Sequence, residues 1–152
     1  EEKMVNTLFK LLSLLFLAFM LTACEKKIVG ERQEMHWDRD MCDRCKMVIS
    51  ERKHAVQVIN KKTGRTYKFD DIGCTILWFK EESIDWKNQA KIWIADIKTS
   101  KWIDARTAYY DTMNITPMSY GFGGHEKKES IQKGFEIIDF NEMSKRILER
   151  GR

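Results

Sequence analysis

The strongest constraint on the fold is a change of hydrophobic period within residues 54–96. Residues 54–60 (HAVQVIN) alternate apolar and polar side chains and are rich in valine. After the turn KKTG, residues 65–70 (RTYKFD) alternate again. Alternation with a period of two is typical of a half-buried strand, so two such segments joined by a short turn predict a β-hairpin.

A helix is expected directly after this hairpin. In residues 70–82 (DDIGCTILWFKEE) the apolar side chains recur at helical spacing, and Asp70 or Asp71 can serve as the N-cap. Residues 91–96 (KIWIAD) return to the pattern of a strand. The first half of the domain is therefore predicted as a β-β-α-β unit.

The second half of the domain follows a similar but looser order. The expected elements are strand material in residues 101–111, a short helix over 126–134 closed by Gly134, a strand over 135–140, and a last helix over 141–150 capped by Asn141. Strands that alternate with single helices, but with hairpins between them, predict an α+β fold. The repeated order suggests two β-β-α-β-like modules.

The N-terminal segment indicates export from the cytoplasm. Residues 11–23 are apolar and uncharged, which is too short for a bilayer-spanning helix of roughly 20 residues but fits the core of a secretory signal. The segment ends in LTAC, and a cysteine at this place resembles the signal of bacterial lipoproteins. A plain signal peptide and an anchor helix are the alternatives. We expect a signal peptide over 1–23, lipidation of Cys24 followed by a tether through residue 35, and an extracytoplasmic domain over 36–152.

Sulfur is concentrated in residues 41–47 (MCDRCKM), which hold two thiols and two thioethers. If Cys24 carries lipid, three thiols remain, so at least one lies outside any internal disulfide. A Cys42–Cys45 disulfide with Cys74 buried in the helix is one interpretation. A thioredoxin-like pair would need a βαβ context, and a zinc site would need a second pair of Cys or His ligands, and both are absent from the pattern.

Copper(I) fits this segment better, because it is soft and accepts thiolate and thioether ligands together. In an extended chain Cys45 and Met47 would share one face, and Cys42 could approach as a third donor through a turn. A thioether also cannot form a disulfide. Four other side chains are weaker candidates, since each is more usually a core or surface residue: Cys74, His36, His54 and His125.

Four motifs in series carry a resemblance to a known family. CDRCKMVIS, FDDIGC, WIDARTAYY and TPMSYGFG, in this order and spacing, resemble the NosL family, which comprises lipoproteins associated with nitrous oxide reductase and regarded as copper(I) chaperones. The match covers about residues 40–140 and the lipoprotein cysteine. The family pattern has Cys-Gly-Met where this chain has Cys45-Lys46-Met47, so the local backbone is in question while both sulfur donors remain.

The resemblance implies both a site and a fold. It assigns the copper ligands to Cys45 and Met47, and it adds Met118 from the Thr-Pro-Met motif. It also implies two modules related to the fold of organomercurial lyase.

The expected function is a membrane-tethered, periplasmic Cu(I) chaperone without enzymatic activity. Its partner would be a copper-receiving protein of nitrous oxide reductase maturation, in denitrification. The formal charge of +4 is not gathered in one basic run, so no nucleic acid is expected. A thiol–disulfide exchange protein and an organomercurial-lyase-like enzyme are the alternatives, although fold analogy alone does not establish an activity.

Overall fold

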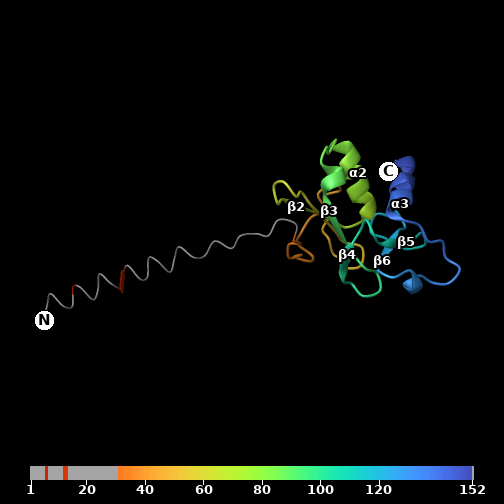
Figure 1. The fold of residues 1–152 in the computed structure, drawn as a ribbon, viewed down its shortest axis with the longest axis horizontal. Coiled ribbons are helices and arrows are strands. Elements are labelled where there is room, and N and C mark those ends of the chain that lie inside the picture. The colour runs from red at the N-terminus through yellow and green to blue at the C-terminus, as the bar shows by residue number, and fades with distance from the viewer. Residues whose placement is uncertain (1–5, 7–11, 14–30, 152) are drawn as a thin grey trace.

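The computed structural model describes residues 6, 12, 13 and 31–151 (Figure 1). The predicted signal peptide and Cys24 therefore lie almost wholly outside the described residues, as does most of the tether. Within the part of the chain that is described, no helix has the length and apolarity needed to cross a membrane.

The first half of the domain forms the predicted β-β-α-β unit. Its three strands are joined by one strand from the predicted second half in a four-stranded antiparallel sheet with the strand order β2-β1-β3-β4, and a helix connects β2 to β3. The elements are β1 (Val56–Ile59), β2 (Thr66–Phe69), α2 (Ile72–Glu81), β3 (Lys91–Ala95) and β4 (Trp102–Asp104). The central strand β1 is buried on both faces, unlike the half-buried strand that its alternation predicts, because the side chain of Gln57 is covered by the backbone of Gln33, with which it exchanges two hydrogen bonds.

Helix α2 begins where the sequence predicts. The side chain of Asp71, the N-cap, accepts a hydrogen bond from the backbone N–H of Gly73 at 2.9 Å. Trp78 of α2 packs against Tyr67 and Phe69 of the hairpin, with ring centroids 4.7 and 5.3 Å apart. Burial of a large apolar side chain stabilises a fold by about 1.5–3 kcal/mol, so this aromatic contact fixes α2 on the sheet.

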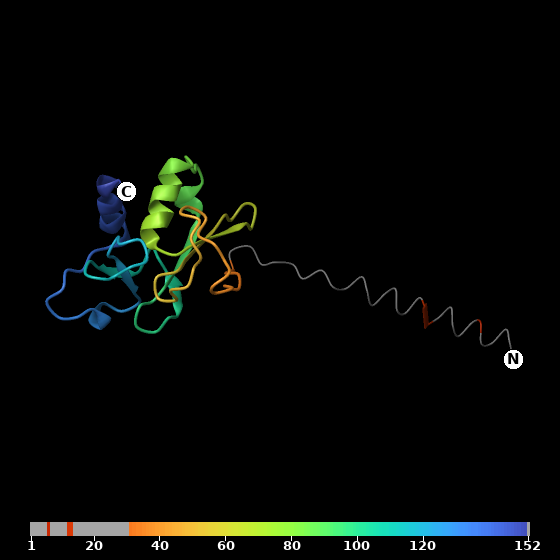
Figure 2. The same ribbon diagram turned by 180° about the vertical axis from the view of Figure 1, so that it is seen from behind.

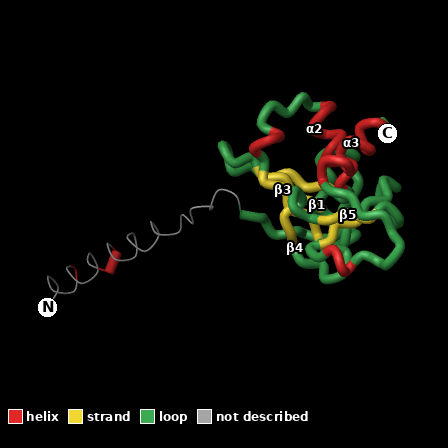
Figure 3. Tube along the Cα trace, turned by 45° about the vertical axis from the view of Figure 1, so that its right-hand side comes forward, coloured by secondary structure: helices red, strands yellow, loops and turns green. Residues whose placement is uncertain are grey.

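The second half contains a two-stranded sheet and the C-terminal helix. Strand β5 (Tyr109–Asp111) pairs with β6 (Gly123–His125), and α3 (Phe140–Arg150) follows. Helices α2 and α3 lie side by side at one end of the molecule, with the strands below them (Figures 2 and 3). The architecture is thus α+β with antiparallel sheets. The second half has two strands and then a helix, as the first half does, but among the described residues no strand follows α3.

Three predictions for the second half need correction. The helix over 126–134 is wrong, because this stretch holds only the short 3-10 turn η2 (Lys128–Ser130), without a side-chain cap and without an apolar face to bury. The strand over 135–140 is reduced to a single bridge between Ile138 and Tyr110. The last helix is capped by Asp139 rather than Asn141, since the Asp139 side chain accepts from the N–H of Glu142 at 2.8 Å.

Candidate metal centre

Residues 41–47, called the ligand loop below, form a tight turn instead of running extended into a strand. The N–H of Cys42 donates to the carbonyl of Met47 at 2.8 Å, and that of Lys46 donates to the carbonyl of Cys42 at 3.0 Å. Lys46 has a φ of 62°. This left-handed conformation suits the glycine of the family pattern, and a lysine can adopt it only at some cost. The shared face that an extended chain would give Cys45 and Met47 is therefore not formed.

The ligand loop is attached to the sheet and to α2. Asp43 exchanges two hydrogen bonds with the backbone of Lys68 in β2, at 2.8 and 2.7 Å. Arg44 makes a bidentate ion pair with Glu81, the last residue of α2, with both distances 2.8 Å. Its guanidinium also donates to the hydroxyl of Tyr120 at 3.2 Å. These contacts hold the cysteines of the loop against the start of α2.

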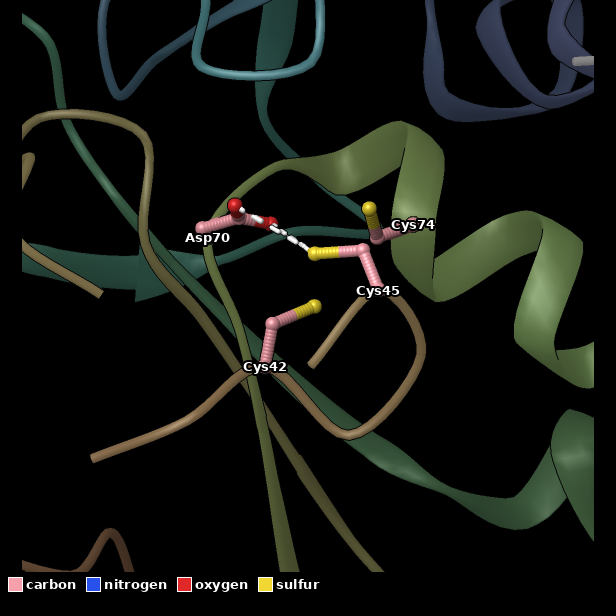
Figure 4. Close-up of side chains that lie close together, drawn as sticks. All are labelled: Cys42, Cys45, Asp70 and Cys74. Atoms are coloured by element: carbon pink, nitrogen blue, oxygen red, sulfur yellow. Dashed lines mark hydrogen bonds between the residues drawn. The ribbon is translucent and has the colours of Figure 1, made fainter. Parts of the chain in front are cut away.

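Four side chains converge at this place (Figure 4). One donor atom from each of Cys42, Cys45, Asp70 and Cys74 lies within 4.8 Å of the others, and we call these residues the thiol cluster. Asp70 comes from the junction of β2 and α2, and Cys74 comes from the first turn of α2. Three members are buried, whereas Cys45 is partly exposed, so solvent reaches the cluster on the Cys45 side.

The three thiols share their protons unequally. Hydrogen bonding from Cys74 lowers the pKa of Cys42 to about 6. The same contact, together with burial, raises the pKa of Cys74, and burial raises the pKa of Cys45 to about 11. A metal ion bound by all three sulfurs would displace the protons of these thiols, because sulfur binds metals as thiolate.

The structure brings together only part of the predicted site. Cys42 and Cys45 lie beside Cys74 in the thiol cluster. Cys74 is buried, as expected for a core residue, and it also contributes a sulfur atom to the cluster. Met47 is two residues after Cys45 in the sequence, and 53% of it is exposed. Met118 lies on another segment and is partly buried against the core. Ligation by Met47 and by Met118 remains a prediction.

Met118 is nevertheless near the start of α2. We call residues 113–120 the methionine segment. The N–H of Met118 donates to the Asp71 carboxylate at 3.2 Å, and Tyr120 packs directly on Gly73, where a Cβ atom would come within 2.1 Å of the ring. The segment therefore contacts the residues that flank Cys74.

None of the three described histidines belongs to the thiol cluster. His36 is exposed beside Asp40, and His54 is buried, which lowers its pKa. The buried ring of His125 has both nitrogens engaged, one with Asp111 at 2.8 Å and the other with Ser130 at 2.7 Å. These contacts make His125 a structural residue.

The sequence analysis missed Asp70 as a possible ligand, treating it only as a helix cap. The capping role belongs to Asp71 alone, which leaves the carboxylate of Asp70 facing Cys45. The signal was the doubled aspartate in FDDIGC, since only one of two adjacent residues can occupy the N-cap position.

Comparisons with a family model and with solved structures each give a match. The family model NosL matches residues 35–127. A solved structure, the copper chaperone NosL from Shewanella denitrificans, superposes with a TM-score of 0.55 over 74% of this chain and 95% of that chain, at 16% identity. At this identity the likeness shows a common fold alone. No curated protein matches the sequence.

Proposed function

Because the chain belongs to the NosL family of copper chaperones, we propose that it binds one Cu(I) ion outside the cytoplasm and passes it to a partner protein. Copper is the cargo in this role, and no bond of a substrate is made or broken. The thiol cluster is the observation that carries the proposal, because three thiols within 4.8 Å of one another offer the soft donors that Cu(I) prefers.

The exposure of the cluster supports transfer of the metal. Cys42 and Cys74 are fully buried, while Cys45 is partly exposed and Met47 is 53% exposed. A donor from a partner can therefore approach copper on the side of Cys45 and Met47 before the buried sulfurs release it. We assign Cys45 and Met47 as principal ligands, Cys42 as a third donor, and Met118 as a ligand that closes over the metal.

Location and recipient are further parts of the proposal. The LTAC pattern supports lipidation of Cys24, which would hold the domain at a membrane on its periplasmic side. The resemblance of four motifs to lipoproteins associated with nitrous oxide reductase supports that enzyme's maturation as the destination of the copper.

The decisive experiment is titration of the purified, reduced chain with Cu(I) in competition with a chromophoric Cu(I) chelator. One Cu(I) per chain is expected, with sulfur neighbours in its X-ray absorption spectrum. A variant with serine at positions 42, 45 and 74 provides the control. The proposal fails if the chelator keeps all the copper, or if the serine variant binds copper as well as the parent does.

The thiol cluster also favours a second candidate, organomercurial cleavage, on a fold that we propose is related to organomercurial lyase. That reaction needs two thiols and an acid at one carbon–mercury bond, and Cys42, Cys74 and Asp70 meet in the cluster. Protonation of the carbon would release a hydrocarbon and leave Hg(II) on the thiolates. Repeated hydrocarbon release from an organomercurial, in the presence of excess free thiol, would favour this enzyme over a carrier.

A further inference from the structure

The copper proposal leaves Asp70 without a role. Its side chain is buried, with 2% of the residue exposed, at the junction between β2 and α2. Both carboxylate oxygens of Asp70 face the Cys45 sulfur, at 3.7 and 3.6 Å. Among the described residues, the hydrogen bond to this carboxylate is donated by the Cys45 thiol. A thiol is a weak donor. A buried carboxylate with so weak a partner is costly unless it binds a cation.

The distances in the cluster suit a tetrahedral metal ion. With metal–sulfur bonds of about 2.3 Å and a metal–oxygen bond of about 2.0 Å, tetrahedral geometry puts neighbouring sulfurs about 3.8 Å apart and sulfur and oxygen about 3.5 Å apart. The distances from the Cys45 sulfur to the Asp70 oxygens are 3.6 and 3.7 Å, and all four donor atoms lie within 4.8 Å of one another. Small side-chain rotations would bring the four atoms around one ion.

The charge of the cluster favours a divalent ion when all four residues bind. Three thiolates and one carboxylate carry four negative charges, so Cu(I) would leave a net charge of −3 and a divalent ion a net charge of −2. Excess negative charge is costly in a buried site.

We propose that Cys42, Cys45, Asp70 and Cys74 form a closed four-coordinate site for a divalent, borderline-soft cation of the Zn(II) type. Cu(I) is held in a different state, by sulfur ligands without Asp70. The sequence pattern argued against zinc because it showed only one pair of ligands, and the fold supplies the missing pair as Asp70 and Cys74. The inference depends on the proposed function only for the copper state.

The test compares Zn(II) and Cu(I) binding in one set of variants. Zn(II) affinity is measured by competition with a chromophoric chelator, and Co(II) serves as a coloured substitute whose visible spectrum separates tetrahedral thiolate sites from six-coordinate ones. Asp70→Asn keeps the size of the side chain and removes its charge. It should lower Zn(II) affinity at least about tenfold, and leave Cu(I) affinity within about threefold.

Two matched variants complete the design. Asp71→Asn changes the neighbouring buried aspartate, and because asparagine also caps helices well it should leave Zn(II) affinity within about threefold. Met47→Leu should lower Cu(I) affinity and leave Zn(II) affinity unchanged. Opposite responses of the two metals to Asp70→Asn and Met47→Leu would support two distinct ligand sets.

Each other result is decisive. Equal loss of both metals in Asp70→Asn would make Asp70 a structural support of the thiols and overturn the inference. Unchanged Zn(II) affinity in Asp70→Asn would also overturn the inference. So would a six-coordinate Co(II) spectrum of the parent chain, a measurement that does not depend on the folding of any variant. A parent chain that binds Cu(I) but not Zn(II) refutes the divalent site alone, whereas one that binds Zn(II) but not Cu(I) refutes the copper function alone.

Discussion

The ligand loop and the methionine segment both contact the start of α2, but they are held in different ways. The ligand loop is tied across its base by the Cys42–Met47 hydrogen bond and is fixed to β2 through Asp43 and to α2 through Arg44. The methionine segment contacts the same region through the N–H of Met118 and through Tyr120, which accepts hydrogen bonds from Arg44 and Arg150, while its Ile115 is 98% exposed.

This difference separates two requirements of a metal carrier. Ligands on a segment with many backbone attachments keep their geometry whether or not the metal is present, which gives affinity. A ligand on a segment that also exposes apolar residues to solvent, as this one does at Met113 and Ile115, can leave at a smaller cost, which gives release. We therefore expect the cysteines of the ligand loop to provide most of the affinity for Cu(I), and Met118 to adjust it.

The largest expected effect comes from Cys45→Ser. Loss of the partly exposed thiol, two residues before Met47 in the sequence, should reduce Cu(I) affinity by at least about 100-fold, since even residues that only support a metal ligand contribute about 10–100-fold. Cys42→Ser should cost less, about tenfold, because this sulfur joins as a third donor. Competition with a Cu(I) chelator measures both.

Two results would contradict the assignment of most of the Cu(I) affinity to the ligand loop with Cys45 as its main thiol. Equal losses in the two variants would indicate a dithiolate site formed by Cys42 and Cys45. If neither variant lost affinity, the copper site would lie outside the ligand loop.

The second prediction tests the contact between the methionine segment and α2. In Gly73→Ala the new Cβ would lie 2.1 Å from the Tyr120 ring, so the segment must move. Overpacking of this kind costs about 1–3 kcal/mol, and the better helix propensity of alanine, worth about 1 kcal/mol, offsets it only in part. Thermal denaturation should show a lower midpoint.

A double variant makes this prediction specific. Gly73→Ala combined with Tyr120→Leu should be more stable than the sum of the two single changes predicts, because the smaller side chain relieves the clash. Strict additivity would mean that Tyr120 does not attach the segment to α2.

The sequence predicted the first half of the fold well, because its elements are encoded locally. Alternating side chains define β1 and β2, and the adjacent aspartates mark the start of α2. The predicted helix over 126–134 failed because charged residues and a terminal glycine do not provide an apolar face. Beyond η2, that region takes its shape from tertiary contacts such as the bridge between Tyr110 and Ile138.

The same distinction applies to the site. The spacing of Cys42 and Cys45 makes their proximity predictable, since two residues separate them. The approach of Asp70 and Cys74 depends on the pairing of Asp43 with Lys68, which joins segments 25 residues apart. No local pattern encodes that pairing, so the sequence assigned Cys74 to the core and Asp70 to a cap.

The smallest expected effect is that of Met118→Leu, and it decides whether the methionine segment supplies a ligand at all. Leucine keeps the size and apolarity of methionine, so the free energy of unfolding should change by less than about 1.5 kcal/mol. Cu(I) affinity should fall by about tenfold, equivalent to about 1.4 kcal/mol, and X-ray absorption should show one fewer sulfur neighbour on copper. Met113→Leu is the matched control, because Met113 belongs to the same segment and is 70% exposed, so neither quantity should change. An unchanged affinity and sulfur count in Met118→Leu would assign Met118 to the core, and the ligand loop would then have to bind and release copper with α2 alone.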